Sequence, residues 1–366
     1  MREYGLVFLV AAAATYLLTP LVRRFAVRVG AMTQPRDRDV HAIPTPRLGG
    51  LAMYAGVVVA MVVAQSLPAL RAGLQGTTEI KAVLIGGGVI TLLGAVDDKW
   101  GLDALTKLTG QVFATGLMVL FGVVLAVVIL PSGEKLFLGR EAAVPLTIIM
   151  AVTMVNSINF IDGLDGLAAG VVAIAAVAFF TYSYQFAHLH GAPAAEPASL
   201  ISAILAGVCI GFLPHNFNPA RIFMGDSGSM LLGLMLAAAT TSGTGKPNLY
   251  LAKSSDLAAL FFPLLIPVLV LAVPFVDLLL AIGRRAIAHK PLFAPDKQHL
   301  HHRLLEIGHS HRRAVLILYL WSALAAFGGV AVSFTRPKLV GVVAGSIAIL
   351  ALAISNFPKL RAHSER

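Results

Sequence analysis

Residues 142–187 read AAVPLTIIMAVTMVNSINFIDGLDGLAAGVVAIAAVAFFTYSYQFA, two apolar runs joined by a short polar segment. The runs cover residues 142–160 and 167–187, and each is close to the ~20 residues that a helix needs to cross a bilayer. The polar segment repeats an amide or a carboxylate at every third position: Asn156, Asn159, Asp162 and Asp165. On a helix that continues through its end, this spacing would place all four on roughly one face, as a divalent cation or a polar headgroup requires. The stretch therefore predicts two membrane helices with a polar site where they meet.

The composition of the whole chain is typical of a polytopic membrane protein. Hydrophobic residues make up 57% of 366 positions, charged residues make up 13%, and the mean hydropathy is +0.83. Further apolar runs of spanning length occur at 4–22, 48–68, 81–96, 110–130, 199–214, 227–243, 257–283, 312–333 and 337–356. The last run is the weakest, so the sequence predicts an all-α fold with 10–11 transmembrane helices. Because no soluble domain or internal repeat is visible, we expect one integral membrane domain over residues 1–366.

The distribution of basic residues predicts the orientation. If the N-terminus lies outside, 19 of the 28 Lys and Arg residues fall in cytoplasmic segments, as the positive-inside rule requires. The net charge of +10 then reflects loops that face anionic membrane lipid. No basic segment is interleaved with aromatic residues, so we expect no nucleic-acid partner.

Five carboxylates fall where apolar runs meet the cytoplasm. They come from three separate loops: Asp97, Asp98, Asp162, Asp165 and Asp226. Carboxylates at membrane depth are costly and usually functional, and their convergence on one membrane face predicts a cytoplasmic active site.

Asp97 and Asp98 begin the segment DDKWGLDALTKLTGQ, residues 97–111. One interpretation is an interfacial charge cluster that ends a helix. The other is a carboxylate pair whose mutual repulsion favours a retained proton, which suits a general base or a secondary metal contact. Lys99 and Lys107 are candidate phosphate contacts.

Asp226 lies in FNPARIFMGDSGSMLLG, residues 217–233, at a predicted helix N-terminus. Such a terminus would offer free N–H groups to phosphate, and Asp226 could hold a magnesium ion. Phe223 could stack on a flat ring. The alternative is that Asp226 is a simple N-cap.

The longest basic loop contains PDKQHLHHRLLEIGHSHRR, residues 295–313. Four of its residues suit an anion-binding cluster for phosphates: His299, His301, His302 and Arg303. A zinc site and a solvated basic loop are the alternatives; zinc would need a second group of ligands. Arg47, in HAIPTPRLGG, is a further candidate contact.

In this order, DDKWGLDALTKLTGQ, NSINFIDGLDGLAAG, FNPARIFMGDSGSMLLG and HLHHR resemble the motifs of the polyprenyl-phosphate N-acetylhexosamine-1-phosphate transferases. The HLHHR cluster is similar to that of the bacterial UDP-GlcNAc branch, the WecA and TagO type. The resemblance implies an enzyme of the bacterial inner membrane that transfers N-acetylglucosamine-1-phosphate from UDP-GlcNAc to undecaprenyl or decaprenyl phosphate. The products would be UMP and a lipid-linked sugar, the first lipid-linked intermediate of a cell-envelope polysaccharide. Mg²⁺, with Mn²⁺ as a substitute, and a homodimer are further implications.

The resemblance also implies roles for individual residues. Asp226 corresponds to the principal magnesium ligand, with Asn159 and Asp162 lining the same site. Asp97, with Asp98 beside it, corresponds to the residue proposed to take the last proton of the lipid phosphate. We expect direct attack by that phosphate rather than a covalent aspartyl-phosphate intermediate.

The remaining implied roles concern the nucleotide sugar. Phe223 corresponds to the position that stacks on uracil, and Gly163, Leu164 and Asp165 correspond to a uridine-contacting loop. The histidine cluster and Arg303 would hold the diphosphate and the edge of the sugar. The alternatives are a phospho-N-acetylmuramoyl-pentapeptide transferase, a UbiA-type prenyltransferase and a transporter.

Overall fold

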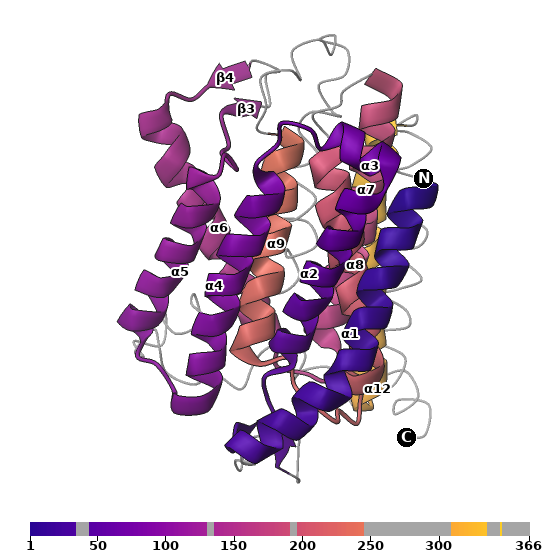
Figure 1. Cartoon of the computed structure of the whole chain (residues 1–366). Coiled ribbons are helices and arrows are strands. Elements are labelled where there is room, and N and C mark those ends of the chain that lie inside the picture. The colour runs from indigo at the N-terminus through magenta and orange to yellow at the C-terminus, as the bar shows by residue number, and fades with distance from the viewer. Residues whose placement is uncertain (34–43, 130–134, 191–195, 245–308, 335–344, 346–366) are drawn as a thin grey trace, which may run out of the picture.

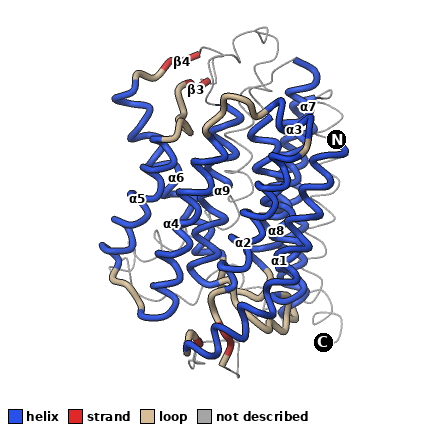
Figure 2. Tube along the Cα trace, in the orientation of Figure 1, coloured by secondary structure: helices blue, strands red, loops and turns tan. Residues whose placement is uncertain are grey.

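The computed structural model describes residues 1–33, 44–129, 135–190, 196–244, 309–334 and 345. This part is a bundle of helices with two short pairs of strands, as Figure 2 shows. The helices are α1 (Arg2–Val29), α2 (Gly49–Ser66), α3 (Pro68–Gly73), α4 (Glu79–Trp100), α5 (Ala104–Leu120), α6 (Arg140–Ile161), α7 (Leu167–His190), α8 (Glu196–Asn216), α9 (Gly225–Thr244) and α12 (His311–Phe334). The strands are β1 (Met32–Thr33), β2 (Thr45–Pro46), β3 (Val127–Ile129) and β4 (Lys135–Phe137). The all-α prediction is confirmed.

Within these described residues, seven helices are long and apolar enough to cross a membrane: α1, α2, α4, α6, α7, α8 and α12. The protein is therefore a multi-pass membrane protein. The predicted span at 257–283 and, apart from residue 345, the span at 337–356 lie outside the described residues, so the total of 10–11 stays a prediction.

One predicted span differs from the structure. The apolar run at 110–130 is not one helix, because α5 ends at Leu120 and Gly122 adopts a left-handed conformation with φ +93°. The chain then forms β3, which pairs antiparallel with β4. Valine and isoleucine dominate this stretch, and their branched side chains favour an extended backbone.

Helix α9 lies at the centre of the bundle, between α4, α6, α8 and α2 (Figure 1). Two glycines permit its close approach to neighbouring helices. A Cβ on Gly94 of α4 would lie 2.3 Å from the nitrogen of Ser227, and one on Gly50 of α2 would lie 2.1 Å from the nitrogen of Gly228. The first turn of α9 is thus fixed against two other helices.

The outer helices carry exposed apolar side chains, as expected for surfaces that face lipid. On α1 and α5 these include Leu6, Leu9, Leu17, Leu21, Phe25, Leu105, Leu108, Phe113 and Leu120. Inside the bundle, α7 and α8 are mostly buried.

The helix junctions that carry the acidic motifs lie at one end of the bundle. In Figure 1 the N-terminus and the strands β3 and β4 lie at the top, whereas the α4–α5 and α8–α9 connections lie at the bottom. The α6–α7 connection lies at that same lower end, since α6 runs downward from the strands. The five carboxylates therefore share one end of the molecule, as predicted.

Candidate active site

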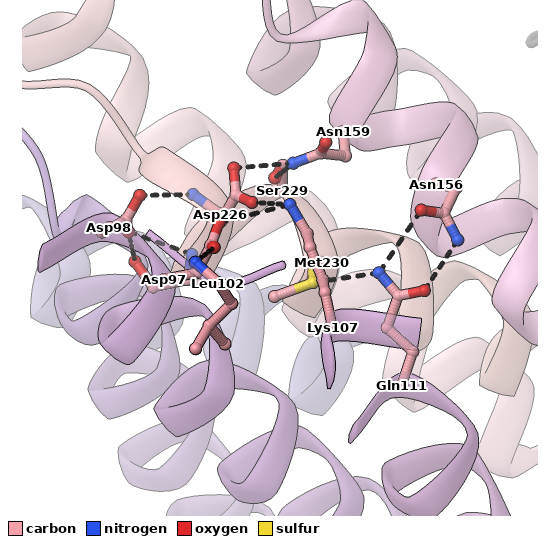
Figure 3. Close-up of polar contacts among 11 residues, drawn as sticks. Asp97, Asp98, Leu102, Lys107, Gln111, Asn156, Asn159, Asp226, Ser229 and Met230 are labelled. Atoms are coloured by element: carbon pink, nitrogen blue, oxygen red, sulfur yellow. Dashed lines mark hydrogen bonds and ion pairs between the residues drawn. The ribbon is translucent and has the colours of Figure 1, made fainter. Parts of the chain in front are cut away.

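Asp226 is the centre of a polar cluster formed by α4, α5, α6 and α9 (Figure 3). Its Oδ1 accepts a hydrogen bond from Nδ2 of Asn159 at 2.9 Å, and its Oδ2 forms an ion pair with Lys107. Nδ2 of Asn159 also lies 2.8 Å from Oγ of Ser229, one turn further along α9. Three helices thus present an amide, an ammonium and a carboxylate to one point.

Lys107 connects two carboxylates. Besides its ion pair with Asp226, its Nζ lies 3.3 Å from Oδ2 of Asp97. The other oxygen of Asp97 accepts the backbone N–H of Leu102 at 2.6 Å, which holds the turn from α4 into α5. The side chains of Lys107, Asp97 and Asp226 keep 15–21% of their surface exposed, so a solute can reach them.

Asp98 is buried, unlike the adjacent Asp97, and it contacts the start of α9. Its carboxylate is buried and accepts the backbone N–H of Asp226 at 2.8 Å, the N–H of Ser227 at 3.1 Å and the hydroxyl of Ser227 at 2.8 Å. An anion at this position caps the helix and interacts favourably with its dipole. The prediction of free N–H groups at the start of α9 is therefore wrong for these two residues, because Asp98 already binds them.

Gly225 permits this contact between Asp98 and α9. Its φ is +67°, and a Cβ there would lie 2.3 Å from Oδ2 of Asp98. Any other residue would meet both a strained backbone and a steric clash.

Arg47 lies near this cluster because its segment pairs with the chain before α9. The N–H of Phe223 donates to the carbonyl of Pro46 at 2.8 Å, and the N–H of Gly49 donates to the carbonyl of Phe223 at 3.1 Å. The guanidinium of Arg47 donates to the hydroxyl of Thr33. Phe223 is half-buried next to these bonds.

Asp162 directly follows the last residue of α6. Burial raises the pKa of its carboxyl well above the usual value, and the nearby carboxylates of Asp226 and Asp98 raise this pKa further. Arg47 opposes the shift by lowering the pKa. The buried position of Asp162 thus disfavours its charged form more than the nearby Arg47 favours it.

Asp165 is not on the face that carries Asn159. A shared face required the helix to continue through its end, but α6 ends at Ile161, Gly166 has φ +79°, and α7 begins at Leu167. Oδ2 of Asp165 accepts hydrogen bonds from Nδ2 of Asn218 and the N–H of Ala220, both at 3.0 Å. Asp165 thus links the α6–α7 loop to the α8–α9 loop. The predicted contact of Asp165 with uridine did not include this structural role.

The other residues of the predicted uridine loop differ in exposure. Leu164 is buried in the core, whereas Gly163 is exposed. Only Gly163 thus presents its surface to solvent in this loop.

Other predicted residues lie apart from the cluster or beyond the described residues. Lys99 is exposed, and its ammonium lies 4.4 Å from the ring centroid of Trp100, a cation–π contact. Four predicted anion-binding residues lie outside the described residues: His299, His301, His302 and Arg303.

Sequence reasoning did not single out Gln111. Gln111 is buried and exchanges two hydrogen bonds with Asn156 beside the cluster (Figure 3). The sequence did contain a signal, since Gln111 is an amide in the apolar run at 110–130. Buried polar groups are normally paired, so a partner for this amide could have been expected.

Comparisons with known proteins show to which family the chain belongs. The model of glycosyl transferase family 4 matches residues 80–244, which contain the whole cluster around Asp226. A decaprenyl-phosphate N-acetylglucosaminephosphotransferase from Mycolicibacterium smegmatis is 48% identical over 364 residues, which cover 99% of this chain and 90% of the relative. The chain belongs to glycosyl transferase family 4.

Two further relatives represent two branches of this family. A probable undecaprenyl-phosphate N-acetylglucosaminyl 1-phosphate transferase from Bacillus subtilis is 36% identical, over 86% of this chain and 80% of the relative. A phospho-N-acetylmuramoyl-pentapeptide-transferase from Mycolicibacterium smegmatis is 28% identical, over 89% of this chain and 95% of the relative. The chain is thus more similar to these two N-acetylglucosamine enzymes than to this pentapeptide transferase.

Proposed function

We propose that the protein transfers N-acetylglucosamine-1-phosphate from UDP-GlcNAc to a polyprenyl phosphate in the membrane. The observation that carries this proposal is the 48% identity to a decaprenyl-phosphate N-acetylglucosaminephosphotransferase over 99% of the chain. The product is a polyprenyl-diphosphate-GlcNAc, the first lipid-linked intermediate of a cell-envelope polysaccharide.

The reaction exchanges one phosphoanhydride for another. An oxygen of the lipid phosphate forms a bond to the β-phosphorus of UDP-GlcNAc, and the bond from that phosphorus to the bridging oxygen breaks. The electron pair leaves with UMP. Phosphoryl transfer of this kind depends mainly on positioning and on stabilisation of charge on the phosphoryl oxygens.

Lys107 is the residue best placed to supply positive charge in the described part of the cluster. Its ammonium lies between the carboxylates of Asp97 and Asp226, and it is partly exposed. It can therefore orient Asp97 toward the entering lipid phosphate and offer its remaining hydrogen-bond capacity to a phosphate oxygen. Since phosphate monoesters are largely ionised near neutral pH, Asp97 has at most one proton to accept.

The residues present also fit a magnesium ion by their chemistry. Mg²⁺ prefers oxygen ligands and is usually bound by one or two carboxylates together with substrate phosphates and water. Asp226, whose side chain keeps 20% of its surface exposed, would hold it together with Asp162 and the amide oxygen of Asn159. When bound, the ion neutralises charge on the diphosphate. No group of three or more His, Cys, Asp or Glu side chains converges on a metal position in the described residues, so substrate oxygens would complete the coordination.

The active site would face the cytoplasm of a bacterial inner membrane. The support is the excess of Lys and Arg in the segments that the positive-inside rule assigns to the cytoplasm. UDP-GlcNAc would then reach the site from water, while the lipid carrier would enter from the bilayer.

Substrate choice tests the proposal. Purified protein is given Mg²⁺, decaprenyl or undecaprenyl phosphate, and either UDP-GlcNAc or UDP-MurNAc-pentapeptide, and UMP release is measured with lipid and metal omitted in turn. We expect release with UDP-GlcNAc that needs both lipid and metal. Release with the pentapeptide substrate alone would assign the protein to the peptidoglycan branch, and release without lipid would contradict the transfer.

A further inference from the structure

Gln111 and Asn156 form a reciprocal pair of hydrogen bonds between α5 and α6 (Figure 3). Nδ2 of Asn156 donates to Oε1 of Gln111 at 2.7 Å, and Nε2 of Gln111 donates to Oδ1 of Asn156 at 3.3 Å. Nε2 of Gln111 also lies 3.3 Å from Sδ of Met230 on α9. The pair therefore joins the same three helices that Lys107, Asn159 and Asp226 join.

The two sets of contacts are one helical turn apart. Lys107 precedes Gln111 by four residues on α5, and Asn159 follows Asn156 by three residues on α6. Residues at these spacings lie on one face of a helix, one above the other. Any shift of α5 along α6 at the amide pair would therefore move Lys107 relative to Asn159 and Asp226.

The buried side chains of α5 lie in the part of the helix that is farther from the site. Its buried residues are Gln111, Ala114, Thr115, Met118 and Val119. The turns before Gln111 bury none of their side chains, although they carry Lys107. Gln111 is thus the buried contact of α5 that lies nearest to the site.

The site end of α5 is held against α4. A Cβ on Gly110 of α5 would lie 2.6 Å from the side chain of Leu93 on α4, and the N–H of Leu102 donates to Asp97 in the short turn between the two helices. These contacts place α5 relative to α4, but they do not set its distance from α6. At this end of the two helices, the amide pair supplies a directional contact between α5 and α6.

We propose that the amide pair of Gln111 and Asn156 is a positioning element that holds α5 and α6 at the spacing in which Lys107 and Asn159 meet at Asp226. The pair carries no charge, so it fixes geometry without adding to the electrostatics of the site. Gln111 and Asn156 act through Lys107 and Asn159 and touch no substrate themselves. This inference rests on the proposed function for its kinetic consequence but not for its structural one.

The kinetic test compares Q111L, N156L, Q111L/N156L and the swapped pair Q111N/N156Q with the parent. We expect the apolar double variant to keep the unfolding temperature of the parent, because two leucines replace both polar partners together. Its kcat should fall about 10- to 100-fold, since a small misplacement of reacting groups is costly. KM for UDP-GlcNAc should change less than about threefold. The swapped pair should recover most of the lost turnover.

The matched control is T115V. Thr115 is buried on the same helix, one turn further from the site, and among the described residues its hydroxyl bonds to the carbonyls of Gln111 and Val112 within α5. T115V should keep the kcat of the parent. A folded Q111L/N156L with parental kcat would overturn the proposal. If that variant does not fold, a folded Q111N/N156Q with less than about a tenth of the parental kcat would overturn it.

A structural test needs no activity. Spin labels are placed at L105C on α5 and F160C on α6, both exposed positions, in a C209A background that removes the buried native cysteine. Pulsed electron spin resonance should give a broader or longer distance distribution for Q111L/N156L than for the parent. Equal distributions would overturn the inference. A parent that releases no UMP would refute the proposed function and leave this measurement decisive for the helix spacing.

Discussion

The carboxylate of Asp98 accepts the backbone N–H of Asp226 at 2.8 Å, although 128 positions separate the two residues. The neighbouring carboxylate of Asp97 instead faces Lys107. The two adjacent aspartates of α4 therefore have different roles. Asp98 caps the start of α9, whereas Asp97 forms an ion pair with Lys107.

Replacing Asp98 should reduce both stability and turnover. D98N loses at least one of three hydrogen bonds to a buried anion, which should cost about 1–3 kcal/mol and lower the unfolding temperature. Turnover should fall as well, because Asp226 is no longer held. The control is D97N, whose carboxylate accepts one backbone N–H, that of Leu102. Thermal unfolding in detergent separates the two, and equal unfolding temperatures for D98N and the parent would contradict the capping role.

Asp226 should be essential for turnover but not for folding. D226N keeps the size of the side chain but removes the charge that pairs with Lys107, and we expect kcat to fall by more than about 10³-fold. D103N is a matched control at the same end of the bundle. Asp103 is an exposed N-cap of α5, and asparagine caps helices equally well. Near-normal UMP release by D226N would refute its place at the centre of the site.

Substitution of the two lysines of the 97–111 segment should change kcat to different extents. K107M removes the ammonium between Asp97 and Asp226, so we expect kcat to fall about 10²- to 10³-fold. K99M removes only a cation–π contact with Trp100 at the surface, so its kcat should stay close to that of the parent. Steady-state kinetics of both variants checks this difference. An equal loss in both would mean that Lys99 also reaches the substrate.

Removal of divalent metal should abolish turnover reversibly. EDTA should stop UMP release, and an excess of Mg²⁺ or Mn²⁺ should restore it, because oxygen ligands of this kind accept both ions. Ca²⁺, which takes more ligands at longer distances, should restore it poorly. Full turnover in EDTA would contradict the metal assignment of Asp226, Asn159 and Asp162.

Much of the fold could be predicted because apolar runs of spanning length are an unambiguous signal. The runs around residues 142–160 and 167–187 correspond to α6 and α7, and the carboxylates between them lie at the predicted end of the bundle. The failures were local. The apolar run at 110–130 is interrupted at Gly122, and the three-residue spacing from Asn156 to Asp165 does not continue along one helix, since the chain turns before Gly166; both glycines adopt positive φ values.

The contacts within the site could be predicted less well, because they depend on which helix packs against which. No spacing rule links Asp98 to the N–H groups of Asp226 and Ser227. Likewise, Gln111 and Asn156 become partners only when α5 lies beside α6. Sequence could indicate that such polar groups need partners, whereas the fold decides which partners they have.

The most direct test of the central claim follows the two phosphates of the donor. UDP-GlcNAc is labelled with ³²P at either the α- or the β-phosphate and incubated with the protein, Mg²⁺ and decaprenyl phosphate, and the lipid is then extracted. Transfer of GlcNAc-1-phosphate predicts that the β label enters the lipid fraction and the α label stays in water as UMP. Recovery of both labels in water as UDP, with only the sugar on the lipid, would contradict the account.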